Sequence, residues 1–399
     1  MKVLVLNCGS SSIKYKLFEM DTKEILAQGG IEKIGLRGSF LKINLPNGEK
    51  ITYEKNIPEH TAGIEFILKT LTSPEYGAIK SLDEIDAVGH RVVHGGEAFS
   101  KSVLIDKEVT DMIVACSDLA PIHNPANLKG INAISEILPD VPQVAVFDTA
   151  FHQTMPDYAY MYAIPYELYD KYGVRRYGFH GTSHRYVSQR VCDFLGVQPE
   201  GLKIITCHIG NGGSISAIKD GMCVDTTMGL TPLEGLMMGT RSGDIDAGAV
   251  TFIMEKEGLN TTGVSNLLNK KSGVLGISGV SSDMRELLAA CAAGNEKAIL
   301  AEKMYYYRIK KYIGAYAAAL GGVDIILFTG GVGENQMECR REVCKDMEFM
   351  GIELDNEVNA KVRGEEAIIS TPASKVKVVV IPTDEELLIA SDTMDILNK

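Results

Sequence analysis

The residues best suited to chemistry are concentrated between Ile204 and Asp246. Two β-branched runs there flank the glycine-rich tip 210–213, a pattern that predicts a β-hairpin whose tip carries almost no side chains. Because a bare tip lets backbone N–H groups approach an anion closely, we expect a phosphate to bind there; an ordinary tight turn is the alternative. The segment that follows contains one arginine, Arg241, among the polar side chains of Thr226, Thr227, Thr231, Thr240, Ser242, Asp244 and Asp246.

Two more charged side chains follow buried strands. Arg91 lies at the end of an apolar strand within 85–97, and Asp148 follows the apolar run 144–147. Sheet ends are where α/β proteins bind ligands, so we expect Arg91 to contact one. A buried carboxylate at Asp148 loses hydration and therefore needs a partner, a metal or a catalytic task, with helix capping as the alternative.

The first twenty residues repeat the hairpin plan seen after Ile204. A strand, the small-residue turn 7–12 and a second strand carrying Lys14 follow one another, which indicates an internal duplication. Two such hairpins facing each other would hold a phosphate chain from both sides. Lys14 would add a positive charge there, or would be a solvated strand lysine.

The C-terminal half contains a further arrangement typical of nucleotide binding. The apolar stripe 301–320 predicts a core helix, 325–328 a buried strand, and the glycines of 329–335 a turn that leads into a helix. The glycine- and serine-rich segment 270–285 is interpreted as a flexible surface loop. The carboxylates of 384–386 are interpreted as caps of a terminal helix.

Length and composition restrict the class of protein. A chain of 399 residues predicts two domains, and 45% hydrophobic with 23% charged residues is typical of a soluble globular protein. The net charge of −12 argues against a nucleic-acid partner but is compatible with a small anionic ligand. The eight scattered cysteines predict no zinc site, and the absence of an apolar leader or span predicts a cytoplasmic chain without membrane contact.

Three glycine-rich turns after buried strands, with two arginines and an aspartate at strand ends, favour phosphoryl transfer. The sequence contains no Gly-Lys dipeptide, which excludes a P-loop, and it contains no H-R-D or D-F-G triplet of a protein kinase. The architecture left for a duplicated, hairpin-based nucleotide clamp is the actin-like ATPase fold.

Several segments closely resemble those of the acetate kinase family, and the resemblance extends from Met1 to the terminal P-T-D-E-E-L. They are N-C-G-S-S-S-I-K at 7–14, G-H-R-V-V-H-G-G at 89–96, F-D-T-A-F-H-Q-T-M-P at 147–156, Y-G-F-H-G-T-S-H at 177–184, H-I-G-N-G at 208–212, M-G-T-R-S-G-D-I-D at 238–246 and G-G-V-G-E-N at 330–335. The resemblance implies an α/β, duplicated actin-like ATPase (ribonuclease H-like) fold. It also implies an N-terminal domain of 1–149 plus 383–399, a nucleotide-binding domain of 150–382, and an active site in the cleft between them.

The resemblance further implies an enzyme that transfers a phosphoryl group to a carboxyl group. The reaction would be direct, reversible, in-line transfer of the ATP γ-phosphoryl group to acetate, giving acetyl phosphate and ADP. Mg²⁺, with Mn²⁺ as an alternative, would assist it in a cytoplasmic homodimer. A kinase for propionate or another short-chain fatty acid is one alternative, because one methylene contributes only about 1–3 kcal/mol of discrimination. A non-catalytic, actin- or chaperone-like ATPase is another.

The site residues implied by the resemblance fall into four groups. Arg91 would bind the acetate carboxylate, Arg241 would lie beside the transferred phosphoryl group, and His180 would bond that group in the transition state. Asp148 would be the catalytic carboxylate, which orients Arg91 or the waters of the metal. Substrate would also contact Val93, Ile122, His123, Phe179 and Pro232, with Ile122 standing where the family commonly has leucine. ATP would contact Lys14, His208, Ile209, Gly210, Asn211, Gly212, Asp283, Met284, Arg285, Gly331, Val332, Gly333, Glu334 and Asn335, and the metal would contact Asn7 and Glu385.

Overall fold

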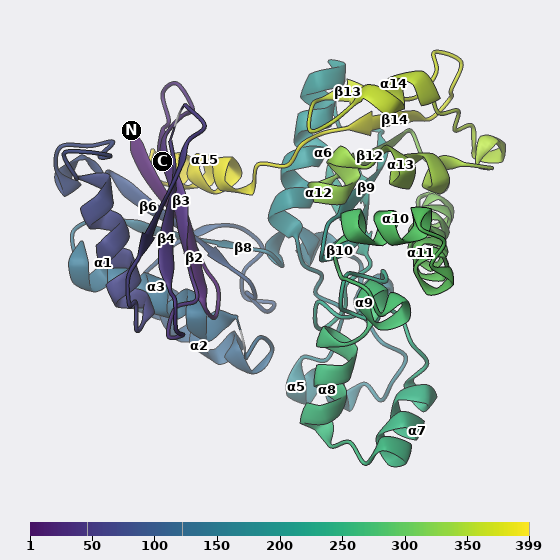
Figure 1. Cartoon of the computed structure of the whole chain (residues 1–399), viewed down its shortest axis with the longest axis horizontal. Coiled ribbons are helices and arrows are strands. Elements are labelled where there is room, and N and C mark those ends of the chain that lie inside the picture. Colours follow the sequence, from purple (N-terminus) through teal and green to yellow (C-terminus); the bar gives the residue numbers. More distant parts are fainter. Residues whose placement is uncertain (46, 122, 399) are drawn as a thin grey trace. The chain divides into compact units, whose positions relative to one another are not determined.

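The computed structural model describes residues 1–45, 47–121 and 123–398. The chain divides into two compact units (Figure 1): unit 1 is Met1–Gln153 with Asp384–Lys399, and unit 2 is Thr154–Thr383. The predicted domains, 1–149 with 383–399 and 150–382, stay a prediction.

The described strands of unit 1 form one sheet in the order β5-β4-β3-β2-β1-β6-β8-β7. β1, β2 and β3 are antiparallel neighbours, whereas β6 and β8 run parallel to β1. The strands are β1 (Lys2–Cys8), β2 (Ser12–Glu19), β3 (Glu24–Glu32), β4 (Phe40–Asn44), β5 (Lys50–Glu54), β6 (Ala87–Val92), β7 (Val103–Leu104) and β8 (Gln143–Phe147).

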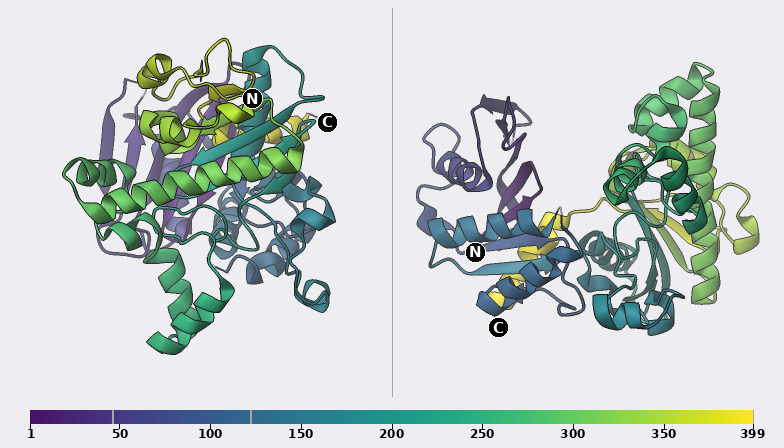
Figure 2. Two further views of the ribbon diagram at one scale, coloured as in Figure 1. Left: turned by 90° about the vertical axis from the view of Figure 1, so that its right-hand side faces the viewer. Right: turned by 90° about the horizontal axis from the view of Figure 1, so that it is seen from below.

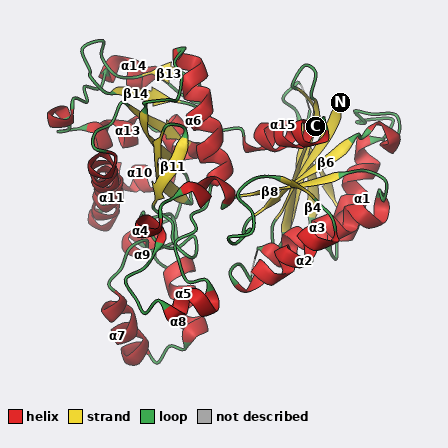
Figure 3. Cartoon of the chain, turned by 180° about the vertical axis from the view of Figure 1, so that it is seen from behind, coloured by secondary structure: helices red, strands yellow, loops and turns green. Residues whose placement is uncertain are grey.

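Helices cover both faces of this sheet (Figures 1 and 3). Along β1, Leu4 and Leu6 belong to the core beneath α1 and α3, and the alternate residues Val3 and Val5 pack on the other face against Ile389 of α15. The two faces follow from the two-residue period of a strand. The helices of unit 1 are α1 (His60–Leu71), α2 (Lys107–Ala115), α3 (Asn124–Ile137) and α15 (Glu385–Leu397), with the short turns η1 (Leu82–Glu84), η2 (Cys116–Asp118) and η3 (Ala150–Thr154).

Unit 2 repeats this strand plan. Its described strands have the order β11-β10-β9-β12-β14-β13, with β9, β10 and β11 antiparallel and β12 and β14 parallel to β9. Five strands therefore match β3-β2-β1-β6-β8, which confirms the predicted duplicated, actin-like fold class. The strands are β9 (Lys203–Ile209), β10 (Gly213–Lys219), β11 (Met222–Thr226), β12 (Ile325–Thr329), β13 (Ala367–Ile368) and β14 (Lys377–Val380).

The longest helix of unit 2, α11, lies along the sheet (Figure 2) and buries the predicted stripe, including Tyr305 and Ile309. Helix α6 covers the opposite face, and α7 and α8 lie apart from the sheet (Figure 3). The helices are α4 (Asp157–Tyr160), α5 (Glu167–Tyr172), α6 (Gly181–Leu195), α7 (Ala247–Glu257), α8 (Thr261–Lys270), α9 (Gly273–Ser278), α10 (Met284–Ala292), α11 (Glu296–Leu320), α12 (Gly330–Asn335), α13 (Met337–Cys344) and α14 (Asn356–Lys361), with η4 (Glu348–Met350).

Two predictions about loops are wrong. The segment 270–285 contains α9 and the start of α10, because the N–H groups of Val274 and Leu275 bond the carbonyls of Met238 and Gly239 and so hold α9 in place. These tertiary contacts outweigh the loop-like composition. The glycine-rich segment after β12 is helical from Gly330 onward.

None of the helices formed by the described residues has the length and apolar character needed to span a membrane.

Candidate active site

Arg91 and Asp148 meet at the carboxyl edge of the unit 1 sheet. Their strands, β6 and β8, are parallel neighbours, so their ends lie side by side. Arg91 donates from Nε to Oδ1 of Asp148 at 2.9 Å and from Nη2 to Oδ2 at 2.6 Å. Asp148 is 1% exposed, so this bidentate pair supplies the partner that its buried carboxylate requires.

Glu385 lies in the first turn of α15 and adds a second carboxylate beside Arg91, with its Oε2 at 3.9 Å from Nε. Burial raises the pKa of Glu385 to about 7; the Arg91 charge lowers it and the Asp148 charge raises it. Desolvation lowers the pKa of Arg91, but the two carboxylates raise it to a net value above its ordinary one. The guanidinium is therefore permanently charged. Of the three predicted caps, Asp384 is the helix N-cap, with Oδ1 accepting from Leu387 N at 3.1 Å.

The described residues of unit 1 that are predicted to contact metal or substrate lie on or next to β1, β6, α3 and α15. Asn7 pairs with Lys14 across the β1–β2 hairpin, and Lys14 is exposed. Asn127 of α3 ties the two strand ends together, because it donates to the Cys8 carbonyl at 2.8 Å and accepts from Val93 N at 3.0 Å. His123 is the N-cap residue of α3, and Ile122 lies outside the described residues.

In unit 2, Arg241 and His180 approach the glycine tip between β9 and β10. A Cβ built on Gly212 would lie 3.5 Å from Arg241 Nη1, and 3.6 Å and 3.7 Å from His180 Cε1 and Nε2, so the guanidinium and the Cε1–Nε2 edge of the imidazole border the same point. Arg241 Nη1 also donates to the Pro232 carbonyl at 3.3 Å. Burial lowers the pKa of Arg241, which still leaves the guanidinium charged near neutral pH.

His180 is the N-cap residue of α6 in a left-handed conformation, with φ 56°. Its ring lies against that of His208, with 4.4 Å between the centroids, and its Nδ1 lies 2.9 Å from Ser214 Oγ. Phe179, the residue before it, is buried.

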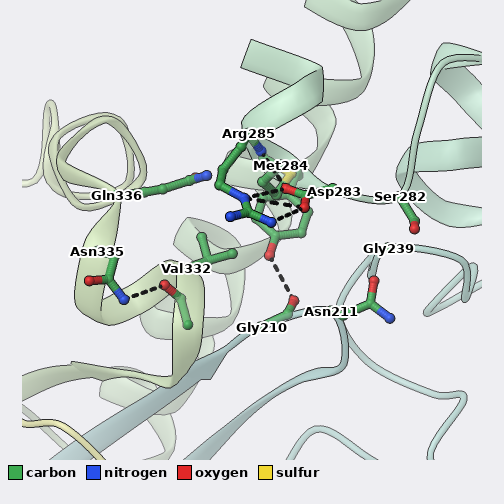
Figure 4. Close-up of a pocket in the computed structure, with 12 residues that line it drawn as sticks. Gly210, Asn211, Gly239, Ser282, Asp283, Met284, Arg285, Val332, Asn335 and Gln336 are labelled. Atoms are coloured by element: carbon green, nitrogen blue, oxygen red, sulfur yellow. Dashed lines mark hydrogen bonds and ion pairs between the residues drawn. The ribbon is translucent and has the colours of Figure 1, made fainter. Parts of the chain in front are cut away.

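A cavity of about 650 Å³ adjoins the same glycine tip, a volume suited to a nucleotide-sized ligand (Figure 4). Arg285 bonds the carboxylate of Asp283 and is 85% exposed, so it presents a flat cation at the cavity. That bond lowers the pKa of Asp283 to about 2. The lining residues are Gly210, Asn211, Gly239, Ser282, Asp283, Met284, Arg285, Tyr305, Gly331, Val332, Asn335 and Gln336.

Most of the residues predicted to hold ATP line this cavity. Of the others, Glu334 is turned to the backbone, where its Oε1 accepts from Gly330 N at 2.8 Å and from Thr383 N at 3.1 Å. Four more residues of unit 2 that are predicted to hold ATP are not among the lining residues of the cavity: His208, Ile209, Gly212 and Gly333. Lys14 belongs to unit 1.

Sequence reasoning missed Gly239, Ser282, Tyr305 and Gln336 of the lining. Gly239 lies within the segment M-G-T-R-S-G-D-I-D at 238–246, and its role is steric: a Cβ there would lie 2.0 Å from Asn211 Oδ1. Gln336 directly follows the G-G-V-G-E-N motif, and adjacency was its only signal. Tyr305 was assigned to the core stripe, but its hydroxyl also donates to the Gly210 carbonyl at 3.4 Å.

The buried Arg340 was missed as well. Its guanidinium donates to the carbonyls of Gly333 and Glu334, both at 2.9 Å, and to Asn359 Oδ1 at 2.7 Å. These bonds hold the C-terminal end of α12 beside the cavity. In the sequence Arg340 is one of several charged residues in a short helix, which predicts a solvated face.

A family model described as the acetokinase family matches residues 2–391. The chain belongs to the acetokinase family. It is 86% identical to the acetate kinase of Bacteroides thetaiotaomicron over 399 residues, all of both chains. Among solved structures, Porphyromonas gingivalis acetate kinase is 64% identical with a TM-score of 0.97, and a propionate kinase from Francisella tularensis subsp. tularensis is 42% identical with a TM-score of 0.92. Each of these two comparisons covers 99% of both chains. The predicted family resemblance is confirmed.

Proposed function

We propose that this acetokinase-family chain transfers the γ-phosphoryl group of ATP to acetate and catalyses the reverse reaction. The observation that carries the proposal is the approach of Arg241 Nη1 and His180 Nε2 to the Gly212 tip, next to a nucleotide-sized cavity. Arg91, fixed by Asp148 in unit 1, supplies a second guanidinium for the carboxylate substrate. The names of the most similar relatives support the same reaction.

The chemistry that such a site must perform is alignment and charge neutralisation. Acetate is already a carboxylate, so it needs no general base before it attacks the γ-phosphorus. Two anions must instead be held together in line, which fixed cations and aligned donors achieve. Arg241 would neutralise the transferred phosphoryl group, and His180 would donate a hydrogen bond to one of its oxygens.

Asp148 would act through Arg91. In the described part of the chain, Arg91 donates to Asp148 from Nε and Nη2. The two N–H groups of Nη1 are therefore available to the acetate carboxylate. The bidentate pair fixes the plane of the guanidinium. Asp148 is therefore proposed as a positioning residue and not as a base.

Asn7 and Glu385 would hold Mg²⁺, or Mn²⁺, which takes similar ligands. Oxygen donors suit this ion. Burial raises the pKa of Glu385 to about 7, and a bound cation would favour the ionised form of this carboxyl group. No cluster of three metal-binding side chains occurs in the described part of the chain, and Mg²⁺ held by one or two carboxylates and phosphates requires none. When bound with ATP, the ion would neutralise charge on the β- and γ-phosphates.

Acetate is favoured over propionate because the acetate kinases of Bacteroides thetaiotaomicron and Porphyromonas gingivalis, at 86% and 64% identity, are more similar to this chain than the propionate kinase at 42%. Val93, His123, Phe179 and Pro232 are proposed to contact the methyl group of acetate. The ratio of kcat/KM for the two acids tests this choice, and we expect acetate to be preferred by about tenfold or more, the value of one methylene.

We also propose a cytoplasmic homodimer. The eight free cysteines suit a reducing compartment. Exposed aromatic side chains, Tyr158, Tyr166 and Tyr172, lie close together in the sequence and suit a subunit interface. Analytical ultracentrifugation should give about twice the chain mass, and a monomer at micromolar concentration would contradict the dimer.

The dependence of ADP release on acetate tests the proposed reaction. We expect ADP to form rapidly with MgATP and acetate together and only slowly without acetate. Slow ATP hydrolysis that acetate does not accelerate would instead support the actin- or chaperone-like ATPase.

A further inference from the structure

Four side chains of unit 2 form a continuous hydrogen-bonded chain that ends at His180. Thr206 Oγ1 on β9 lies 2.7 Å from His184 Nδ1 on α6, and His184 Nε2 lies 2.7 Å from Ser214 Oγ on β10. Ser214 Oγ in turn lies 2.9 Å from His180 Nδ1. Thr206, His184 and Ser214 are fully buried, so these contacts are protected from exchange with water.

The hydrogen bonds along this series must all be donated in one direction. A hydroxyl group carries one proton, and a neutral imidazole carries one N–H. Ser214 can therefore donate to only one of the two histidines and must accept from the other. If Ser214 donates to His180 Nδ1, the proton of His180 is on Nε2. If Ser214 donates to His184, the proton of His180 is on Nδ1.

The contacts of Thr206 select between these directions. Its hydroxyl can donate to His184 Nδ1 at 2.7 Å or to the Ser216 carbonyl at 3.5 Å, and the second distance is at the limit of a hydrogen bond. Donation to His184 Nδ1 leaves the His184 proton on Nε2, where it is donated to Ser214. Ser214 then donates to His180, so the direction runs from Thr206 to His180.

We propose that Thr206, His184 and Ser214 are positioning residues that keep the proton of His180 on Nε2. That nitrogen belongs to the ring edge, Cε1 and Nε2, that borders the point beside Gly212, and Arg241 Nη1 borders the same point. The proposal rests on the proposed function, in which His180 donates to the transferred phosphoryl group. With the proton on Nδ1, the neutral ring would present a lone pair to an anionic oxygen and would repel it.

The test uses a variant of Thr206, which is not one of the residues proposed to bind substrate. Thr206→Val keeps the shape of the side chain and removes the donor, whereas Thr206→Ser keeps the donor. We expect Thr206→Val to lower kcat about 10- to 100-fold, with small changes in both KM values. This loss is no larger than the loss caused by removing a hydrogen-bond donor that itself stabilises the transition-state charge. Thr206→Ser should restore most of kcat. Thr226→Val is the matched control, because Thr226 is an equally buried threonine of the same sheet. Its hydroxyl bonds Ser216 and the Ile215 carbonyl and does not belong to the series of hydrogen bonds that ends at His180.

The tautomer is read directly by ¹⁵N NMR of histidine-labelled, full-length protein, with the His180 signals identified by their loss in His180→Ala. We expect a protonated Nε2 in the parent protein and in Thr206→Ser, and a mixture of tautomers in Thr206→Val. A proton on Nδ1 in the parent protein would overturn the proposal, and so would an unchanged tautomer together with unchanged kcat in Thr206→Val. Because the NMR measurement needs no turnover, it remains informative even if acetate proves not to be the substrate.

Discussion

Asp148 binds Arg91 through both of its carboxylate oxygens, at 2.9 Å from Nε and 2.6 Å from Nη2. The two residues are far apart in the sequence and meet because β6 and β8 are parallel neighbours. A buried, bidentate pair fixes the plane of the guanidinium as well as its charge. The pair is therefore the element of unit 1 that most directly prepares Arg91 for a carboxylate ligand.

Asp148→Asn keeps the size of the side chain but removes its charge and one acceptor. We expect kcat to fall by at least about 10²-fold, as when an aligned charge contact is lost, with a smaller rise in KM for acetate. Steady-state kinetics with both substrates measure the two effects, and a melting curve checks the fold. Unchanged turnover would leave Asp148 with a structural role alone.

Arg241→Ala should lower kcat by about 10³-fold, as for other arginines that neutralise a transferred phosphoryl group. Arg241→Lys should recover little, since a lysine cannot reproduce the planar fork. Arg190→Ala is the matched control, because Arg190 pairs with Glu366 in the same unit and neither is one of the proposed site residues. A loss of only about tenfold in Arg241→Ala, or about 1.4 kcal/mol of barrier, would contradict the assigned role.

Gln336 is predicted to contribute to nucleobase selection. Its side chain lines the cavity and is oriented toward it in Figure 4, the residue is 8% exposed, and its Oε1 has no hydrogen-bond partner among the described residues. A side-chain amide can pair with adenine, so Gln336→Met should lower the kcat/KM preference for ATP over GTP by about tenfold. Stability should hold or rise, because an unsatisfied buried oxygen is removed. An unchanged ATP to GTP ratio would exclude the role.

His90 should make unit 1 less stable in acid. Its buried ring donates from Nε2 to Gln143 Oε1 at 2.7 Å, and burial lowers its pKa from 6.5 to about 4, against the smaller upward effect of that bond. The contribution of the neutral ring to the free energy of unfolding is therefore complete above about pH 6.5. It is lost as the pH falls toward 4, and the free energy of unfolding then decreases by up to about 1.4 kcal/mol per pH unit. His90→Gln, which cannot titrate, should flatten this part of the stability profile in denaturant unfolding. An equally steep profile in the variant would show that other groups cause it.

The sheet pattern and the residues at strand ends could be predicted from the sequence. Arg91 and Asp148 each follow an apolar strand, and the carboxyl ends of parallel strands gather at one edge. The two glycine-tipped hairpins were visible as repeats of one plan, and the matching strand orders of the two sheets confirm the duplication.

The series of hydrogen bonds from Thr206 to His180 could not be predicted from the sequence in this way. Thr206 reads as an ordinary β-branched strand residue and Ser214 as a small one, and their connection exists only because α6 packs His184 between them. The high pKa of Glu385 results mainly from burial, and the charge of Asp148, which is distant in the sequence, raises it further. Helix α9 is likewise held by carbonyl groups of Met238 and Gly239, which no local composition reveals.

Trapping of the acyl phosphate with hydroxylamine tests the central claim most directly. Purified protein with MgATP, acetate and hydroxylamine should yield acetyl hydroxamate, the yield should require acetate, and Arg241→Ala should lower the initial rate by about 10³-fold. If correctly folded protein hydrolyses ATP but forms no hydroxamate from acetate, propionate or butyrate, the account of two guanidinium groups that bring a carboxylate to a phosphate is contradicted.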